Sequence, residues 1–253
     1  MAHQLGTAQA QQHADAAAPL AVSRLPAIDN LRGLAIIAMV AYHLCFDLRH
    51  FGFITADFYR DPFWLHARTA ILSSFLFIAG MCLVLAQAHA VGRSRFWRQV
   101  VRVAAGATLV SIASYLVFPQ RYIWFGVLHA IAVLLVLLRP LVNRPWLALV
   151  LGIAGIVVGN YWTSPWFYNR AWGWVGFMTA KPATEDYVPL FPWAGVMLMG
   201  MATAGALRRN DFHGLSPLAK LPDILGAMGQ HSLAIYLIHQ PLLFGLLYLA
   251  TRR

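Results

Sequence analysis

The fold of this chain is decided by residues 29–50, which read DNLRGLAIIAMVAYHLCFDLRH. After Arg32 the segment stays apolar for the depth of a membrane and is broken only near Tyr42, His43 and Asp47. On a helix, Arg32 and His43 lie about 20° apart on one face and about 16 Å apart along the axis. Asp47 shares that face because it follows His43 at i+4. Ionisable groups inside a spanning helix are costly, so the segment predicts a membrane helix that carries a functional site.

The composition predicts an integral membrane protein. Hydrophobic residues make up 60% of the 253 residues and charged residues only 11%, against about a quarter in soluble domains. Apolar stretches long enough to span a bilayer occur at 31–48, 67–90, 99–118, 122–138, 146–162, 189–207 and 229–250. We therefore expect an all-α fold, a polytopic membrane helix bundle of about seven transmembrane helices.

The distribution of basic residues predicts the orientation, because Lys and Arg accumulate on the cytoplasmic side of membranes. With the N-terminus inside, 11 of the 19 basic residues are cytoplasmic: Arg24, Arg32, Arg93, Arg95, Arg98, Arg102, Arg139, Arg144, Arg208, Arg209 and Lys220. The cytoplasmic loops are also short and densely basic, so we expect N-in and C-out. The net charge of +10 then reflects topology or an anionic cytoplasmic ligand, and no nucleic-acid-binding motif accompanies it.

The first 22 residues are rich in Ala, Gln and His and have no basic segment ahead of an apolar core, unlike a secretory signal. We interpret residues 1–22 as a disordered cytoplasmic tail and residues 23–253 as one transmembrane domain. Cys45 and Cys82 both fall in predicted spans, where we expect small packing residues and no disulfide.

A basic stripe follows the second predicted span. Arg95, Arg98 and Arg102 recur at i, i+3 and i+7, which places three guanidinium groups along one side of a helix at the cytoplasmic surface. Such groups bind phosphate oxygens in a bidentate manner. The alternative is anchoring to anionic lipid headgroups. Arg32, expected at the same membrane face, favours the phosphate ligand.

Two further histidines lie at intramembrane depth, His129 within residues 124–130 and His239 within residues 236–241. Either one alone fits a packed histidine bonded to a neighbouring carbonyl. Together with His43 and Asp47, they predict a polar cavity within the bundle. No HxxxH or HxxE pair is present, so the sequence gives no support for a zinc site.

Residues 185–193 lead into the sixth predicted span from the outer side. The prolines fit a helix start or a broken first turn, and we expect Asp186 to reach the mouth of the cavity. The preceding loop is crowded with aromatic side chains, namely Tyr161, Trp162, Trp166, Phe167, Tyr168, Trp172 and Trp174. An interfacial aromatic belt explains them, and stacking against a sugar ring is the alternative.

Together, these motifs resemble the membrane acyltransferases of the heparan-alpha-glucosaminide N-acetyltransferase type, particularly their short bacterial relatives. The resemblance covers roughly residues 24–250 and rests on residues 28–33, 42–47, 125–129, 186–193 and 231–241. A looser similarity extends to bacterial membrane acyltransferases that modify surface polysaccharides. There, an Arg, ten residues and a His in the first span, with an Arg-x-x-Arg pair in a cytoplasmic loop, mark the acyl-donor path. Arg32 with His43, and Arg95 with Arg98, fit that pattern.

The resemblance implies transfer of an acetyl group from cytosolic acetyl-CoA to an acceptor, usually a sugar, across a bacterial inner membrane. The implied partners are acetyl-CoA, membrane lipids and a carbohydrate or glycolipid acceptor, and a homo-oligomer is left open. The eukaryotic heparan enzymes have an extra lumenal domain and further spans, and they carry an asparagine where His43 stands. Heparan itself is therefore not the expected substrate.

The implied roles divide between the two membrane faces. Arg95 and Arg98, helped by Arg102 or Arg32, would bind the CoA phosphates. His43 would act as general base or carry the acetyl group. Asp47, or in competition Asp186, would orient its ring, while His129 and His239 would hold the thioester oxygen or shape the acceptor pocket.

Two other function classes are compatible with a bundle of this kind. A proton-linked transporter of a polar solute would also use intramembrane histidines and an aspartate, although no inverted repeat with paired broken helices is evident. A catalytically silent assembly subunit would leave those groups without a purpose. Binding or slow hydrolysis of acetyl-CoA distinguishes the acyltransferase from both.

Overall fold

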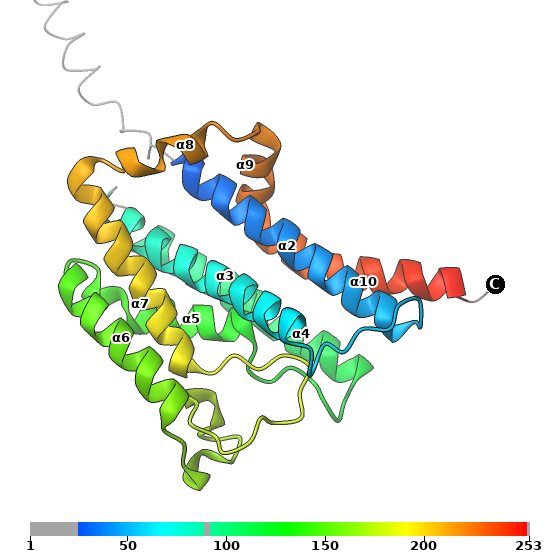
Figure 1. The fold of residues 1–253 in the computed structure, drawn as a ribbon. Helices are drawn as coiled ribbons and strands as arrows, with labels where there is room; N and C mark the ends of the chain where they lie inside the picture. The colour runs from blue at the N-terminus through cyan, green and yellow to red at the C-terminus, as the bar shows by residue number, and fades with distance from the viewer. Residues whose placement is uncertain (1–24, 89–91, 252–253) are drawn as a thin grey trace, which may run out of the picture.

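The computed structural model describes residues 25–88 and 92–251, so the tail predicted at 1–22 lies outside the described residues. The longer helices are α2 (Pro26–His50), α3 (Pro62–Ala88), α4 (Arg93–Val117), α5 (Val127–Leu137), α6 (Pro145–Tyr161), α7 (Leu190–Leu207), α9 (Asp223–Gln230) and α10 (Ser232–Thr251). The short helical segments are α8 (Ser216–Ala219) and the 3-10 helices Arg139–Leu141, Pro165–Phe167, Gly173–Val175, Arg208–Asn210 and His213–Leu215. The predicted all-α membrane bundle is confirmed (Figure 1).

Each of the seven predicted stretches overlaps a helix of the described residues, but these helices differ in length. Five helices, α2, α3, α4, α7 and α10, are long and apolar enough to cross a membrane. With 11 residues, α5 is about 16 Å long, and with 17 residues α6 is about 26 Å long. The shorter α5 begins only after Gly126, whose backbone is extended, and gives way to a 3-10 turn that contains Pro140. Both are shorter than the hydrocarbon core of about 30 Å.

Helices α3, α6 and α7 form one packed layer (Figure 1). A Cβ atom at Gly80 of α3 would collide with the carbonyl oxygen of Met197 in α7, and one at Gly200 would collide with that of Phe77. Small residues of this kind let membrane helices approach closely. The first turn of α7 is broken, since Phe191 has non-helical backbone angles, as the prolines of this segment predicted.

Helices α2, α9 and α10 form the second layer, which carries the site. A Cβ atom at Gly33 would collide with the carbonyl oxygen of Leu225, so α9 can pack directly on the first turns of α2. From there α10 runs alongside α2 in the same direction (Figure 1). At the far end, the rings of His50 and Phe244 lie 5.4 Å apart.

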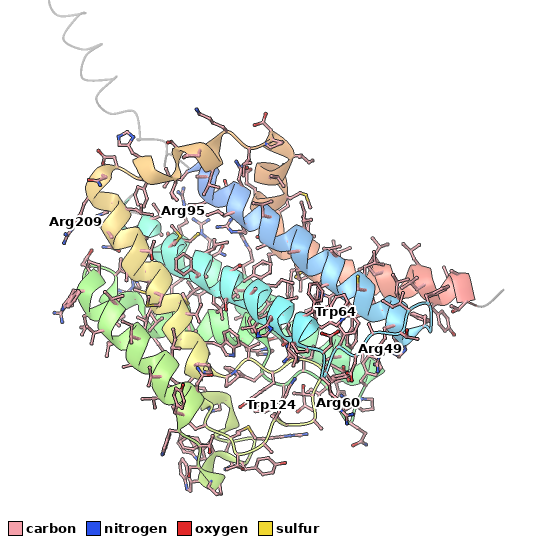
Figure 2. The ribbon with its side chains drawn as sticks, viewed as in Figure 1. Arg49, Arg60, Trp64, Arg95, Trp124 and Arg209 are labelled. Carbon is pink, nitrogen blue, oxygen red and sulfur yellow. The ribbon has the colours of Figure 1, made fainter. Side chains whose placement is uncertain are left out.

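This parallel pair defines two ends, which we name the Arg32 end and the His43 end. Arg95 and Arg209 lie at the Arg32 end, while Arg49, Arg60 and Trp64 lie toward the His43 end (Figure 2). The start of α2 and the end of α10 are therefore at opposite ends of the bundle. This arrangement fits the predicted N-in and C-out topology, and its direction across a membrane stays a prediction.

Candidate functional site

His43 presents a free basic nitrogen. Its Nδ1 lies 2.9 Å from the carbonyl oxygen of Met39, one turn earlier on α2. Because a carbonyl oxygen can only accept, Nδ1 carries the proton and Nε2 carries the lone pair. That Nε2 has no hydrogen-bond partner among the described residues. We expected Asp47 to orient this ring, but the Met39 carbonyl does so.

His239 of α10 lies against His43. The two ring centroids are 4.8 Å apart and the planes are inclined by 70°. His239 Nδ1 donates to the carbonyl oxygen of Tyr236 at 2.8 Å, so its Nε2 also carries a lone pair. That Nε2 is buried and has no partner among the described residues. We call His43 and His239 the histidine pair.

Asp47 and Gln240 meet beside the histidine pair. Asp47 is only 1% exposed, and its Oδ1 accepts a hydrogen bond from Gln240 Nε2 at 2.8 Å. Sequence reasoning missed Gln240, although an amide between His239 and Pro241 in a spanning helix was a usable signal. The other oxygens, Asp47 Oδ2 and Gln240 Oε1, are buried and have no partner in the described part of the chain.

Asp47, His239 and Gln240 together form what we call the polar cluster. It offers three buried acceptor atoms, and no described residue donates to any of them. Leaving such a group unpaired costs about 1–3 kcal/mol, so native structures rarely keep one without a purpose. The cluster therefore suits a ligand group or water that brings N–H or O–H donors. Over residues 25–88 and 92–251, no group of three His, Cys, Asp or Glu is placed to bind a metal.

His129 is tied to the backbone at the start of α5 and to Ser111 of α4. Its Nδ1 accepts from the Gly126 N–H at 3.2 Å, so Nε2 carries the proton and faces Ser111 Oγ at 3.1 Å. Ser111 Oγ in turn donates to the carbonyl oxygen of Ile123 at 2.6 Å. Both ring nitrogens are thus satisfied, which matches the packed-histidine alternative.

Asp186 fixes the start of α5. Its Oδ2 accepts from the Val127 N–H at 3.0 Å, where a carboxylate is favourable at a helix N-terminus. Burial raises the pKa of Asp186, while the Val127 bond and the nearby Lys181 and Arg68 oppose that rise. Asp186 also interacts electrostatically with Tyr236, whose ring lies 5.8 Å from that of His239.

Arg32 joins three helices. It donates from Nη1 to Asp29 Oδ1 (3.4 Å) and the Gly229 carbonyl (3.2 Å), and from Nη2 to Cys82 Sγ (2.9 Å). Cys82 is a free thiol, as predicted. Arg32 and His43 therefore both face the bundle. On the stripe between them, Ile36 and Met39 are buried at 0% and 2% exposure.

The stripe of Arg95, Arg98 and Arg102 lies on an exposed side of α4. The buried face of this helix includes Phe96 and Val100. Arg98 follows Phe96 by two positions, which puts it about 200° around the helix from that face. This placement favours lipid anchoring, and the binding of CoA phosphates by these residues stays a prediction.

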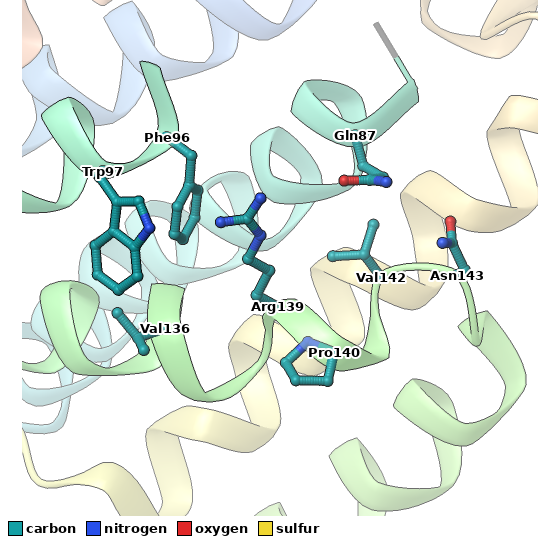
Figure 3. Close-up of a pocket in the computed structure, with 8 residues that line it drawn as sticks. All are labelled: Gln87, Phe96, Trp97, Val136, Arg139, Pro140, Val142 and Asn143. Carbon is teal, nitrogen blue, oxygen red and sulfur yellow. The ribbon is translucent and has the colours of Figure 1, made fainter. Parts of the chain in front are cut away.

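A groove at the Arg32 end holds another cation. It has a volume of about 500 Å³ and is lined by Gln87, Phe96, Trp97, Val136, Arg139, Pro140, Val142 and Asn143 (Figure 3). The Arg139 guanidinium lies 3.9 Å from the centre of the Phe96 ring, which holds it in place. Gln87 and Asn143 also border a second hollow of about 590 Å³ that includes Arg208. In the sequence, Arg139 served only as a topology marker.

Comparison with known proteins gave one family. A family model described as "Heparan-alpha-glucosaminide N-acetyltransferase, catalytic" matches residues 24–241. The matched segment begins just before α2 and includes His43, Asp47, Arg139, His239 and Gln240. The curated proteins and the solved structures gave no match.

Proposed function

Since the chain belongs to the heparan-alpha-glucosaminide N-acetyltransferase catalytic family, we propose that it transfers an acetyl group from acetyl-CoA to an extracytoplasmic acceptor. The acceptor would be an amine or hydroxyl of a carbohydrate or glycolipid, and the membrane a bacterial inner membrane. Membership in a family of acetyltransferases and several apolar helices long enough to span a bilayer support this proposal. Under this proposal, the predicted site residues have separate roles at the two ends of the bundle.

The observation that carries the proposal is the free Nε2 of His43. With Nδ1 committed to Met39, this nitrogen can take the proton of an attacking amine or hydroxyl. When bound, acetyl-CoA supplies a thioester whose carbonyl carbon accepts the nucleophile. In direct transfer, the new C–N or C–O bond replaces the C–S bond, and the proton taken by His43 passes to the leaving thiolate. The same lone pair also suits attack on the thioester and an acetyl-imidazole intermediate.

The polar cluster suits the acceptor. Its unpaired atoms only accept hydrogen bonds, so they match N–H or O–H groups. As neutral rings, neither histidine of the pair offers a free N–H to a thioester oxygen, because each proton is held by a backbone carbonyl. Of the two predicted roles for His239, shaping the acceptor pocket is therefore the one we propose.

The Arg32 end suits the phosphates of the donor. The Arg139 guanidinium is held over Phe96 and borders the groove with two amide side chains, a donor set that fits phosphate oxygens. We propose Arg139 as the phosphate ligand of this groove. Arg32 donates to its three partners within the bundle, and Arg95, Arg98 and Arg102 lie on the exposed side of α4, so binding of CoA phosphates by these four stays a prediction. Asp186 and His129 are proposed to hold the start of α5 beside the site.

The test is acetyl transfer by a His43→Ala variant in nanodiscs, followed by release of free CoA thiol and by mass of the acetylated sugar. We expect turnover to fall by about 10²–10⁴-fold, the usual contribution of a general base. His231→Ala is the matched control, because His231 Nδ1 donates to the Ala227 carbonyl at 2.9 Å but lies exposed at the Arg32 end. Wild-type turnover in folded His43→Ala would refute the assignment. Mass analysis of quenched wild-type protein reports whether His43 becomes acetylated.

A further inference from the structure

A second hollow continues the Arg139 groove at the Arg32 end. In Figure 3, Trp97 and Asn143 stand at opposite ends of that groove, with the Arg139 guanidinium between them and Gln87 near Asn143. Gln87 and Asn143 also line the second hollow, which has a volume of about 590 Å³. Its other lining residues are Leu25, Ala88, Arg208, Asp211 and Phe212. The two hollows therefore adjoin, and we call the second one the Arg208 hollow.

The Arg208 hollow offers several polar side chains that the fold leaves without a partner. In the described part of the chain, the salt bridges within 4.0 Å involve neither Arg208 nor Asp211. The amides of Gln87 and Asn143 likewise make no hydrogen bond to a described residue. A guanidinium, a carboxylate and two amides are thus available to a ligand. The volume of the hollow lies within the usual range of small-molecule sites, about 300–1,000 Å³.

The turn that brings Asp211 and Phe212 to the hollow has a strained backbone. Both residues are left-handed, with φ of 45° for Asp211 and 59° for Phe212. This conformation is rare outside glycine, and for a bulky residue such as phenylalanine it is an outlier that costs free energy. The turn is held in place, because the Phe212 N–H donates to the Leu207 carbonyl at 3.0 Å and the Phe212 side chain packs against the core. Strain of this kind concentrates at binding sites, so it favours a functional role for the turn.

The two charges of the hollow suit neighbouring groups of a phosphorylated ribose. A guanidinium binds phosphate oxygens through two parallel hydrogen bonds, as Arg208 could do. A carboxylate such as that of Asp211 accepts from a ribose hydroxyl, as acidic residues do in dinucleotide sites. A ligand with a phosphate alone would place Asp211 beside a like charge. A ligand with a hydroxyl next to its phosphate gives each charge a partner.

We propose that the Arg208 hollow binds the phosphorylated ribose of the acyl donor, with Arg208 on its 3′-phosphate and Asp211 on the adjacent 2′-hydroxyl. The inference rests on the proposed function and extends it. Acetyl-CoA carries a diphosphate on the 5′ side of this ribose and a single phosphate at the 3′ position. Two adjoining hollows with one guanidinium each match that arrangement, with Arg139 on the diphosphate. Arg208 then sets the preference for donors that carry the 3′-phosphate.

The test compares acetyl-CoA with acetyl-3′-dephospho-CoA, which lacks only the ribose phosphate, in nanodiscs of zwitterionic lipid. For the wild-type protein we expect KM for acetyl-CoA to be about tenfold lower than KM for the dephospho donor. Arg208→Gln should raise KM for acetyl-CoA about tenfold and leave KM for the dephospho donor unchanged, because only acetyl-CoA loses a charged contact. The kcat of both reactions should stay the same.

Two further variants serve as comparisons. Arg209→Gln removes the neighbouring charge, which lines neither hollow and lies at the outer edge of the bundle, and it should change neither KM (Figure 2). Arg139→Gln should raise KM for both donors alike, because both keep the diphosphate. The effect of Arg208→Gln should also shrink at high salt, since salt screens an exposed charge contact.

A second readout separates this inference from the proposed function. Adenosine 3′,5′-bisphosphate should raise the melting temperature of the wild-type protein more than adenosine 5′-monophosphate does, and Arg208→Gln should remove the difference. If that difference is found but no acceptor is acetylated, the proposed function fails and the phosphate site stands. If acetyl transfer shows equal KM for the two donors, or if Arg208→Gln raises both KM values alike, the phosphate site is overturned. It is also overturned if phosphatidylglycerol in the nanodisc, and not the nucleotide, stabilises the protein through Arg208, because the hollow would then bind a lipid headgroup.

Discussion

The two ends of the α2–α10 pair differ in how their ionisable groups are satisfied. At one end, Arg32 directs its donors to Asp29, the Gly229 carbonyl and Cys82, and so joins α2, α3 and the end of α9. At the other end, the polar cluster keeps three buried acceptor atoms without a donor. The first arrangement is complete as a structural joint. The second is complete only with a ligand, which is where chemistry is expected.

The same contrast separates the intramembrane histidines. His129 uses both ring nitrogens on neighbours within the fold, Gly126 and Ser111. His43 and His239 each use one nitrogen on a backbone carbonyl and keep the other free. The three histidines predicted at intramembrane depth thus divide into one packing residue, His129, and two residues with a free ring nitrogen, His43 and His239.

Of the substitutions that test this comparison, one at His239 is expected to have the largest effect on acetyl transfer. His239→Ala should lower acetyl transfer by about 10²-fold, because it removes a buried acceptor atom that positions the sugar nucleophile against His43. The measurement is steady-state thiol release in nanodiscs. Ile238→Ala is the control, since Ile238 is 60% exposed on the outer side of α10. If the two variants turn over at the same rate, the histidine pair has no catalytic role.

A smaller effect is expected at the opposite end, where Arg139→Gln should change binding of the donor and leave the chemistry intact. We expect KM for acetyl-CoA to rise about tenfold with kcat unchanged, because one charged phosphate contact is lost. Acetylpantetheine, a thioester without the nucleotide, should show no change. Arg144→Gln removes a charge nearby that borders neither hollow. An equal rise for both donors would place the effect of Arg139 in the fold instead.

The smallest expected effect is a pH dependence of stability that comes from Asp186. Burial raises its pKa in the folded protein, so its contribution to stability is present below the unfolded pKa of about 3.9 and is lost as pH rises through the folded value. Asp186→Asn keeps an acceptor for Val127 and removes this dependence. The melting temperature of the wild-type protein should therefore fall relative to the variant as pH rises from about 4. If the melting temperatures of the wild-type protein and Asp186→Asn change equally with pH, this prediction is contradicted.

The parts of the fold that depend on local pattern could be predicted from the sequence. The length of the apolar stretches and the 3.6-residue period gave the helices and the shared face of Arg32 and His43. The short α5 could not be predicted from hydropathy, because the extended backbone of Gly126 and the Asp186 carboxylate set its start. These are tertiary constraints on a continuous apolar run.

The candidate site, too, could be predicted from the sequence only in part. Ionisable residues in a spanning helix marked His43, Asp47 and His239, but their partners could not be read from spacing. The orientation of His43 depends on a backbone carbonyl, and Asp47 finds its partner on α10.

The most direct test of the division between the two ends is acetyl transfer across a sealed membrane. Proteoliposomes would hold glucosamine inside and receive acetyl-CoA only outside, with protein-free liposomes as the control for leakage. If the donor binds at the Arg32 end and the acceptor meets His43 at the opposite end, N-acetylglucosamine should accumulate in the lumen, and His43→Ala should abolish it. Product that forms only when donor and acceptor share one compartment would contradict this division.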